Sequence, residues 1–163
     1  AIDPALGTLA DFEAFVAKQL AQQLQHPLIL KAQARLHHLV RHKGDDWFRL
    51  KPDLLVRDAA GERLVLDTKW KLIDARKANG TDKYGLAQAD FYQLQAYGQS
   101  YLQAKGDVVL IYPLTEVFEQ ALPVFDFPHA PGLRLWVVPF CLKTRTFRAP
   151  LTGPFDTIFR AAA

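Results

Sequence analysis

The sequence predicts an α/β fold in which a mixed central sheet is flanked by helices. Two stretches, residues 8–25 and 86–105, place apolar side chains at helical spacing. An apolar hairpin lies between them, and two almost wholly apolar strands follow the second helix. Helices and strands in such an order pack as layers around a shared sheet. With 163 residues, half of them apolar, the chain fits one domain with a substantial core.

The first helix is expected to begin at Thr8, because Thr8 and Asp11 form a T-x-x-D capping pair. It should end near Gln25, ahead of Pro27. Glu13 lies beside the apolar stripe, and two interpretations stay open for it. It is either a solvated glutamate that favours the helix dipole or a carboxylate directed at a site. The stripe itself consists of Phe12, Val16, Leu20 and Leu24.

The stretch Leu28–Arg41 alternates loosely and predicts one strand, followed by a turn at Lys43–Asp46. Histidines in this stretch could in principle bind a metal. No carboxylate or cysteine in the segment completes a ligand set, so exposed histidines on an edge strand are the better interpretation. These histidines are His37, His38 and His42.

The segment Lys51–Lys71 reads as two strands joined by a tight turn at residues 58–61. Because side chains alternate along a strand, Asp67 and Lys69 should share the face of Val65, with Leu66, Thr68 and Trp70 opposite. Asp53 stands where the first strand begins. Two carboxylates and an ammonium therefore converge at one end of an apolar hairpin, where buried charges need partners or a metal.

Such a trio suits metal-assisted hydrolysis of a phosphodiester. Carboxylate oxygens bind Mg²⁺ or Mn²⁺, the metal activates a water, and a nearby lysine stabilises the negative charge of the transition state. The spacing fits the PD-(D/E)xK pattern of many nucleases, with Pro52-Asp53 followed, after thirteen intervening residues, by Asp67-Thr68-Lys69. A surface hairpin with an ordinary Asp–Lys pair is the alternative.

The remaining elements follow in order along the chain. The polar stretch Ile73–Tyr84 predicts a loop whose Arg76, Lys77, Lys83 and Tyr84 have the composition of a phosphate-contacting flap or of an ordinary solvated loop. The helix at 86–105 carries one apolar stripe and one polar–aromatic stripe, the latter suited to a groove or to a boundary with solvent. The polar–aromatic stripe is Asp90, Gln93, Tyr97 and Tyr101; buried strands follow at Asp107–Leu114 and Leu133–Phe140, and a short helix at 153–160.

Composition limits the partners and the compartment. The formal charge is +3, which allows a local basic patch for nucleic acid but does not require one. The single cysteine, Cys141, excludes an internal disulfide and a cysteine-based zinc site. No apolar run approaches the roughly 18 residues of a membrane span, and we expect a cytoplasmic protein. The absence of methionine suggests a segment of a longer protein, with residues 1–7 a linker or expression remnant and 8–163 the domain.

Three blocks in the middle of the chain resemble a known family. LKPDLLVRD, LVLDTKWK and YGLAQADFYQLQAYGQSY occur in this order between Leu50 and Tyr101. Their order and spacing are similar to those of the C-terminal nuclease domain of the McrC family, the cleavage subunits of McrBC modification-dependent restriction systems. The segment Asp11–Leu20 also fits the opening of that domain. The resemblance implies a PD-(D/E)xK restriction-endonuclease-like fold.

Carried over residue by residue, the resemblance makes Asp53 and Asp67 the metal-binding acids and Lys69 the catalytic lysine. Glu13 takes the place of a first-helix glutamate that joins the metal site in many related nucleases. Gln93 and Tyr97 match a pair that would steady the site and contact DNA. Tyr84 and Asp90 are further candidates near the site.

The expected function is therefore a Mg²⁺-dependent endonuclease acting on double-stranded DNA, with Mn²⁺ as a substitute, in modification-dependent (type IV) restriction. A McrB-like AAA+ GTPase would recruit and activate the nuclease through an N-terminal region outside this chain. No membrane partner is expected. The alternatives are another nuclease of the same fold, such as a RecB-like repair nuclease or a junction resolvase, and a non-catalytic DNA-binding or assembly module. No dedicated pocket for a modified base is expected.

Overall fold

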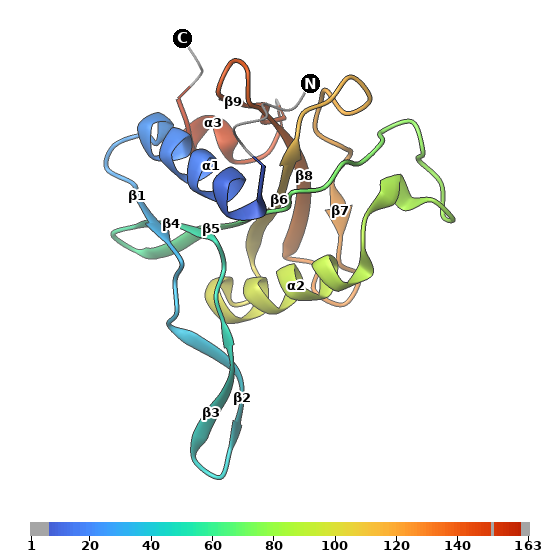
Figure 1. The fold of residues 1–163 in the computed structure, drawn as a ribbon. Coiled ribbons are helices and arrows are strands. Elements are labelled where there is room, and N and C mark those ends of the chain that lie inside the picture. Colours follow the sequence, from blue (N-terminus) through green and yellow to red (C-terminus); the bar gives the residue numbers. More distant parts are fainter. Residues whose placement is uncertain (1–6, 151, 161–163) are drawn as a thin grey trace.

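A mixed β-sheet forms the centre of the molecule (Figure 1). The structure is a computed structural model and describes residues 7–150 and 152–160. Strands β1, β4 and β5 pair antiparallel, whereas β5, β6 and β8 pair parallel. The expected mixed sheet is therefore confirmed. In spatial order the sheet runs β1 (Ile29–Ala32), β4 (Leu54–Asp58), β5 (Gly61–Thr68), β6 (Gly106–Pro113), β8 (Leu133–Cys141) and β7 (Phe125–Asp126), and β9 (Thr146–Phe147) pairs with β8.

Helices cover both faces of this sheet, as Figure 1 shows. Helices α1 (Leu9–Gln23) and α3 (Phe155–Ile158) pack on one face, and α2 (Gln88–Leu102) packs on the other. Strand alternation separates the two cores, because Leu64 and Leu66 of β5 join the core of α1 while Val65 joins the core of α2. The helix predicted for the C-terminal segment is confirmed as α3, and the flanked-sheet class is confirmed with it.

The ends of the two long helices follow from local chemistry. The Thr8 hydroxyl accepts a hydrogen bond from the Asp11 amide at 3.1 Å, which confirms the predicted cap. Helix α2 ends where Gln103 adopts a left-handed conformation with φ 52°. Within α2, Gly98 allows a close approach to β8, since a Cβ atom there would lie 2.7 Å from the Leu133 side chain.

The prediction of a single strand over Leu28–Arg41 is wrong. Strand β1 ends at Ala32, Gln33 takes φ 54°, and the chain then leaves the sheet. Strands β2 (His37–His42) and β3 (Asp45–Leu50) form a separate two-stranded sheet that projects from the body (Figure 1). We call residues 35–51 the arm. Its loop is only Lys43-Gly44, both with positive φ, as two-residue hairpins require, so Asp45 and Asp46 belong to a strand and not to the predicted turn.

The predicted hairpin at residues 51–71 is confirmed as β4 and β5. The Asp58 carboxylate closes its turn by accepting hydrogen bonds from the amides of Ala60 and Gly61. The loop predicted for residues 73–84 is also confirmed, apart from a short 3₁₀ turn, η1 (Lys83–Gly85), at its end. No helix in the described residues is long and apolar enough to cross a membrane.

Candidate active site

The two aspartates predicted to bind metal lie side by side at the end of the β4–β5 hairpin. Asp53 immediately precedes β4, and Asp67 is the penultimate residue of β5. The antiparallel register that pairs Leu54 with Leu66 also brings these aspartates opposite each other. An oxygen of Asp67 accepts a hydrogen bond from the Asp53 amide at 3.2 Å. The hairpin therefore converts a separation of fourteen residues into direct contact.

Lys69 completes the trio directly after β5. Its Nζ lies 2.9 Å from Asp67 Oδ2 and 3.4 Å from Asp90 Oδ1. The same ammonium donates a hydrogen bond to Gln93 Oε1 at 2.8 Å. The Lys69 amide donates to the Ile111 carbonyl of β6 at 2.8 Å, which fixes the backbone where the strand ends. The predicted convergence of Asp53, Asp67 and Lys69 is present in the structure.

The polar–aromatic stripe of α2 attaches this cluster to the root of the arm. Gln93 Nε2 donates to the Tyr97 hydroxyl at 2.9 Å, and that hydroxyl donates to the Lys51 carbonyl at 3.2 Å. One helical turn on, the Tyr101 hydroxyl donates to the Leu50 carbonyl at 2.7 Å and accepts from the Leu36 amide at 3.1 Å. Both tyrosine side chains are buried and their hydroxyls bond to the backbone of the arm, so these hydroxyls do not reach water.

Glu13 reaches the cluster from α1. Its carboxylate accepts a hydrogen bond from Gln33, a residue just after β1. Burial, the negative charge of Asp53 and a hydrogen bond with Asp53 raise the pKa of Glu13. The structure therefore brings Glu13 beside Asp53, as the second of its two interpretations expects, while its role as a ligand stays a prediction.

The electrostatics of the trio reflect crowding of negative charge. Burial and the neighbouring Asp53 raise the pKa of Asp67 to about 7, against the opposing effect of Lys69. Burial alone would lower the pKa of Lys69, but the carboxylates of Asp67 and Asp90 outweigh it and raise that pKa. The Lys69 ammonium is thus held charged. Its single positive charge does not balance the negative charges of Asp53, Asp67 and Asp90.

The donor set fits a hard divalent cation in its chemistry. The acids Glu13, Asp53 and Asp67 offer only carboxylate oxygens, and their mutual repulsion helps to raise the pKa of Glu13 and of Asp67. A bound cation would offset this repulsion, and metal ligands generally release any bound protons on binding. Among residues 7–150 and 152–160, no three acidic, histidine or cysteine side chains already form a ready metal cluster. Hydrogen bonds from neighbouring backbone and side chains take up part of the ligand oxygens.

Three residues at the site escaped the sequence analysis. Thr68, between the acid and the lysine of the motif, donates from both its amide and its hydroxyl to Asp53 Oδ2 at 2.8 Å. Gln33 positions Glu13. The hydroxyl of Tyr112 on β6 is buried without a hydrogen-bond partner among the described residues, and burial and the charge of Asp90 raise its pKa. The x position of D-x-K could have pointed to Thr68; no sequence signal marked the other two.

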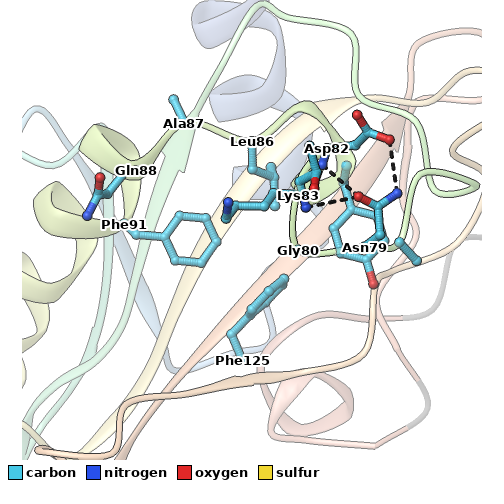
Figure 2. Close-up of a pocket in the computed structure, with 12 residues that line it drawn as sticks. Asn79, Gly80, Asp82, Lys83, Leu86, Ala87, Gln88, Phe91 and Phe125 are labelled. Carbon is cyan, nitrogen blue, oxygen red and sulfur yellow. Dashed lines mark hydrogen bonds between the residues drawn. The ribbon is translucent and has the colours of Figure 1, made fainter.

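Tyr84 does not join this network among the described residues. Its ring packs against Phe125, with 6.3 Å between ring centroids, and lines a cavity of about 890 Å³, drawn in Figure 2. The cavity lies between the loop, the start of α2 and Phe125, not over the carboxylates. Arg76, for which a phosphate-contacting flap and a solvated loop both stayed open, pairs with Asp74 at 2.8 Å. The cavity is lined by residues 78–84, Leu86, Ala87, Gln88, Phe91 and Phe125.

Comparisons with known proteins agree with this geometry. The family model described as "McrBC 5-methylcytosine restriction system component" matches residues 10–113. A solved structure also matches, a refined half-complex from a tetradecameric assembly of Thermococcus gammatolerans McrB AAA+ hexamers with bound McrC. The match has a TM-score of 0.59 at 16% identity, and it covers 82% of this chain and 28% of that one. No curated protein matches.

The two comparisons carry different weight. At 16% identity, the structural match supports a shared fold, and this chain spans little more than a quarter of the chain it matches. The family match extends over more than half of the 163 residues and includes the whole Glu13–Asp53–Asp67–Lys69 cluster. The chain belongs to the McrBC 5-methylcytosine restriction system component family.

Proposed function

We propose that the chain is the endonuclease domain of a McrC-like subunit, which hydrolyses phosphodiester bonds of double-stranded DNA with Mg²⁺. One observation carries the proposal: Lys69 Nζ lies 2.9 Å from Asp67, which in turn accepts a hydrogen bond from the Asp53 amide. The acids and the lysine that fit a PD-(D/E)xK pattern are thus in contact at the end of one hairpin. Membership of a restriction-system family supports the same conclusion.

The residues of the site have separable tasks. Thr68 holds one Asp53 oxygen through two hydrogen bonds, which fixes the direction of that carboxylate. Gln93 and Asp90 hold the Lys69 ammonium at the edge of the cluster. From there Lys69 can orient an attacking water or stabilise the additional negative charge of a phosphate in its transition state. Glu13, Asp53 and Asp67 would hold the cation.

When bound, Mg²⁺ would lower the pKa of a coordinated water and neutralise charge on the phosphate. Deprotonation of Asp67, whose pKa is about 7 without metal, would accompany binding. Affinity for the metal should therefore rise with pH through neutrality. Mn²⁺ should substitute, because it prefers the same oxygen ligands. The products would be 5′-phosphate and 3′-hydroxyl ends, as the resemblance to PD-(D/E)xK nucleases implies.

The partner is part of the proposal. The solved McrC that shares this fold is bound to McrB AAA+ hexamers. We infer that the full-length protein likewise works with an AAA+ GTPase, through a region outside the 163 residues. Recognition of a modified base would belong to that partner.

Cleavage of plasmid DNA by the full-length protein with its AAA+ partner and GTP tests the proposal. The parent should cut with Mg²⁺ and stop with EDTA, while Asp53→Ala and Asp67→Ala should abolish cutting. Asp58→Ala is a matched control, because Asp58 belongs to the same hairpin but contacts Arg63 at its far end. Equal cutting by the parent and the Asp67→Ala variant, or cutting in EDTA, would refute the assignment.

A further inference from the structure

The arm exposes apolar side chains that a solvated hairpin would avoid. The exposed fractions of Trp47 and Phe48 are 48% and 67%, and those of Leu39 and Val40 are 55% and 46%. Phe48 also has φ 59°, which is rare for an aromatic residue. Figure 1 shows this two-stranded ribbon projecting away from the central sheet and from the helices that cover it. A projecting surface of this kind indicates a partner.

The arm also carries the entire excess of positive charge. Residues 35–51 contain five of the 20 Lys and Arg side chains and two of the 17 acidic ones. The rest of the chain therefore has fifteen of each sign, and the net +3 belongs to the arm. Arg41 pairs with Asp46 at 3.1 Å. No ion pair forms at Arg35, Lys43, Arg49 or Lys51 within the described residues.

The root of the arm is fixed at the candidate active site. Lys51, its last residue, is two positions from Asp53, and the hydroxyls of Tyr97 and Tyr101 bind the carbonyls of Lys51 and Leu50. A polymer that presents a phosphate to Asp53 and Lys69 therefore lies close to this root. Each strand of the arm has six residues, which span about 20 Å. That length matches roughly six base pairs of a duplex.

We propose that the arm is a DNA-binding β-ribbon that lies in a groove of the duplex beside the phosphodiester bond to be cut. Its free cations contact phosphates, and Trp47 and Phe48 contact base edges or sugars. The major groove admits a two-stranded β-ribbon, and phosphate contacts of Lys and Arg supply affinity. Charge argues against a second copy as the occupant, because two arms that met would each bring a charge of +3.

The proposal rests on DNA being the substrate, and a binding assay without catalysis tests it. Fluorescence anisotropy of a labelled 30-base-pair duplex would be followed in EDTA across a range of KCl, with the 163-residue chain. Lys43→Ala/Arg49→Ala should weaken binding about tenfold or more at low salt and reduce the slope of log K against log salt by about two. Trp47→Ala/Phe48→Ala should weaken binding without changing that slope.

The control is Lys143→Ala/Arg145→Ala, which removes two exposed cations of the β8–β9 turn and should leave both affinity and slope unchanged. Melting temperatures should stay equal, since all the replaced side chains are exposed. Arm variants that bind like the parent, or a parent that fails to bind even at 25 mM salt, would overturn the proposal. So would arm variants that only dissociate a dimer.

Cleavage by the complete complex is read separately. Lost binding in the arm variants, with no cutting by the parent under any condition, would leave the arm assignment standing and remove the nuclease assignment. Suppose instead that the parent cuts at full rate and the arm variants bind and cut equally well. The nuclease assignment would then stand, and the arm assignment would be removed.

Discussion

Replacing Asp67 with asparagine should stabilise the metal-free protein at alkaline pH while it removes cleavage. Asp67 is 3% exposed and lies beside a second carboxylate, so its charged form is disfavoured in the fold. Asparagine has nearly the same shape and no charge at any pH. The variant separates two properties that most substitutions at an active site change together, because the acid needed for chemistry is a source of instability.

The magnitude follows from the pKa. Burial first, and then Asp53, raise the pKa of Asp67 from 3.8 to about 7. Between these values the native state binds up to one more proton than the unfolded chain, so stability falls as pH rises through this window and is lowest above it. Three pH units at about 1.4 kcal/mol each give an upper value of about 4 kcal/mol. Because Asp53 is part of the same charge system, we expect a fall of about 2–4 kcal/mol.

Urea unfolding at pH 5 and pH 8.5 in EDTA measures the effect. The parent should lose stability between the two pH values, and Asp67→Asn should lose much less and be the more stable protein at pH 8.5. Mg²⁺ should restore stability to the parent but not to the variant. Asp58→Asn is the control, because Arg63 lowers the pKa of Asp58 and its linkage has the opposite sign. A parent whose stability does not fall with pH, or a variant that falls equally, would refute the reasoning.

Three further predictions follow from other contacts. Glu13→Gln should weaken Mn²⁺ binding in calorimetry and slow cleavage, whereas unchanged metal affinity would return Glu13 to a solvated helix residue. Tyr101→Phe should lower the free energy of unfolding, measured in urea, by about 2 kcal/mol, because it leaves the Leu36 amide and the Leu50 carbonyl without their buried partner. A loss below about 0.5 kcal/mol would contradict that account. The isolated 163-residue chain should bind DNA weakly and salt-sensitively and cut it negligibly at physiological salt. Plasmid cleavage by the chain alone at the rate of the full complex, without GTP, would indicate a stand-alone nuclease.

Much of the fold could be predicted because the relevant signals are local. The apolar runs at Leu54–Val56 and Leu64–Leu66, with a Gly-containing turn between them, specified the hairpin, and strand alternation then placed Asp67 and Lys69 on one face. The side of Trp70 was also correct, since its ring packs on Phe12 of α1 with 5.1 Å between centroids. The Thr8 cap and the burial pattern of β6 and β8 were equally local.

The arm could not be predicted by the same means. Its strands are exposed along most of their length, so the loose alternation of Leu28–Arg41 could not show that the stretch divides between two separate sheets. The break at Gln33 depends on a left-handed backbone that glutamine seldom adopts. Asp45 and Asp46 are typical of turns, yet cross-strand contacts with His42 and Arg41 hold them in a strand. Two-residue strands such as β7 and β9 exist only because β8 offers an edge.

At the site, residues near the motif could be predicted and residues from other elements could not. Gln93 and Asp90 were found through the polar–aromatic stripe and the family resemblance, and both contact Lys69. Tyr84 belongs to the same sequence block, but the loop directs its ring to a separate cavity. Gln33 and Tyr112 reach the acids only through tertiary packing, so nothing in their neighbourhood along the chain signalled a role.

Single-turnover cleavage by Lys69→Ala tests the central claim most directly. The measurement uses the full-length protein with its AAA+ partner, GTP and Mg²⁺, with DNA affinity determined in parallel. Loss of about 3–4 kcal/mol of transition-state stabilisation predicts a rate lower by on the order of a hundred- to a thousand-fold, with DNA affinity within about threefold of the parent. Cleavage by Lys69→Ala at the parent's rate would contradict the assignment of this cluster as the nuclease centre.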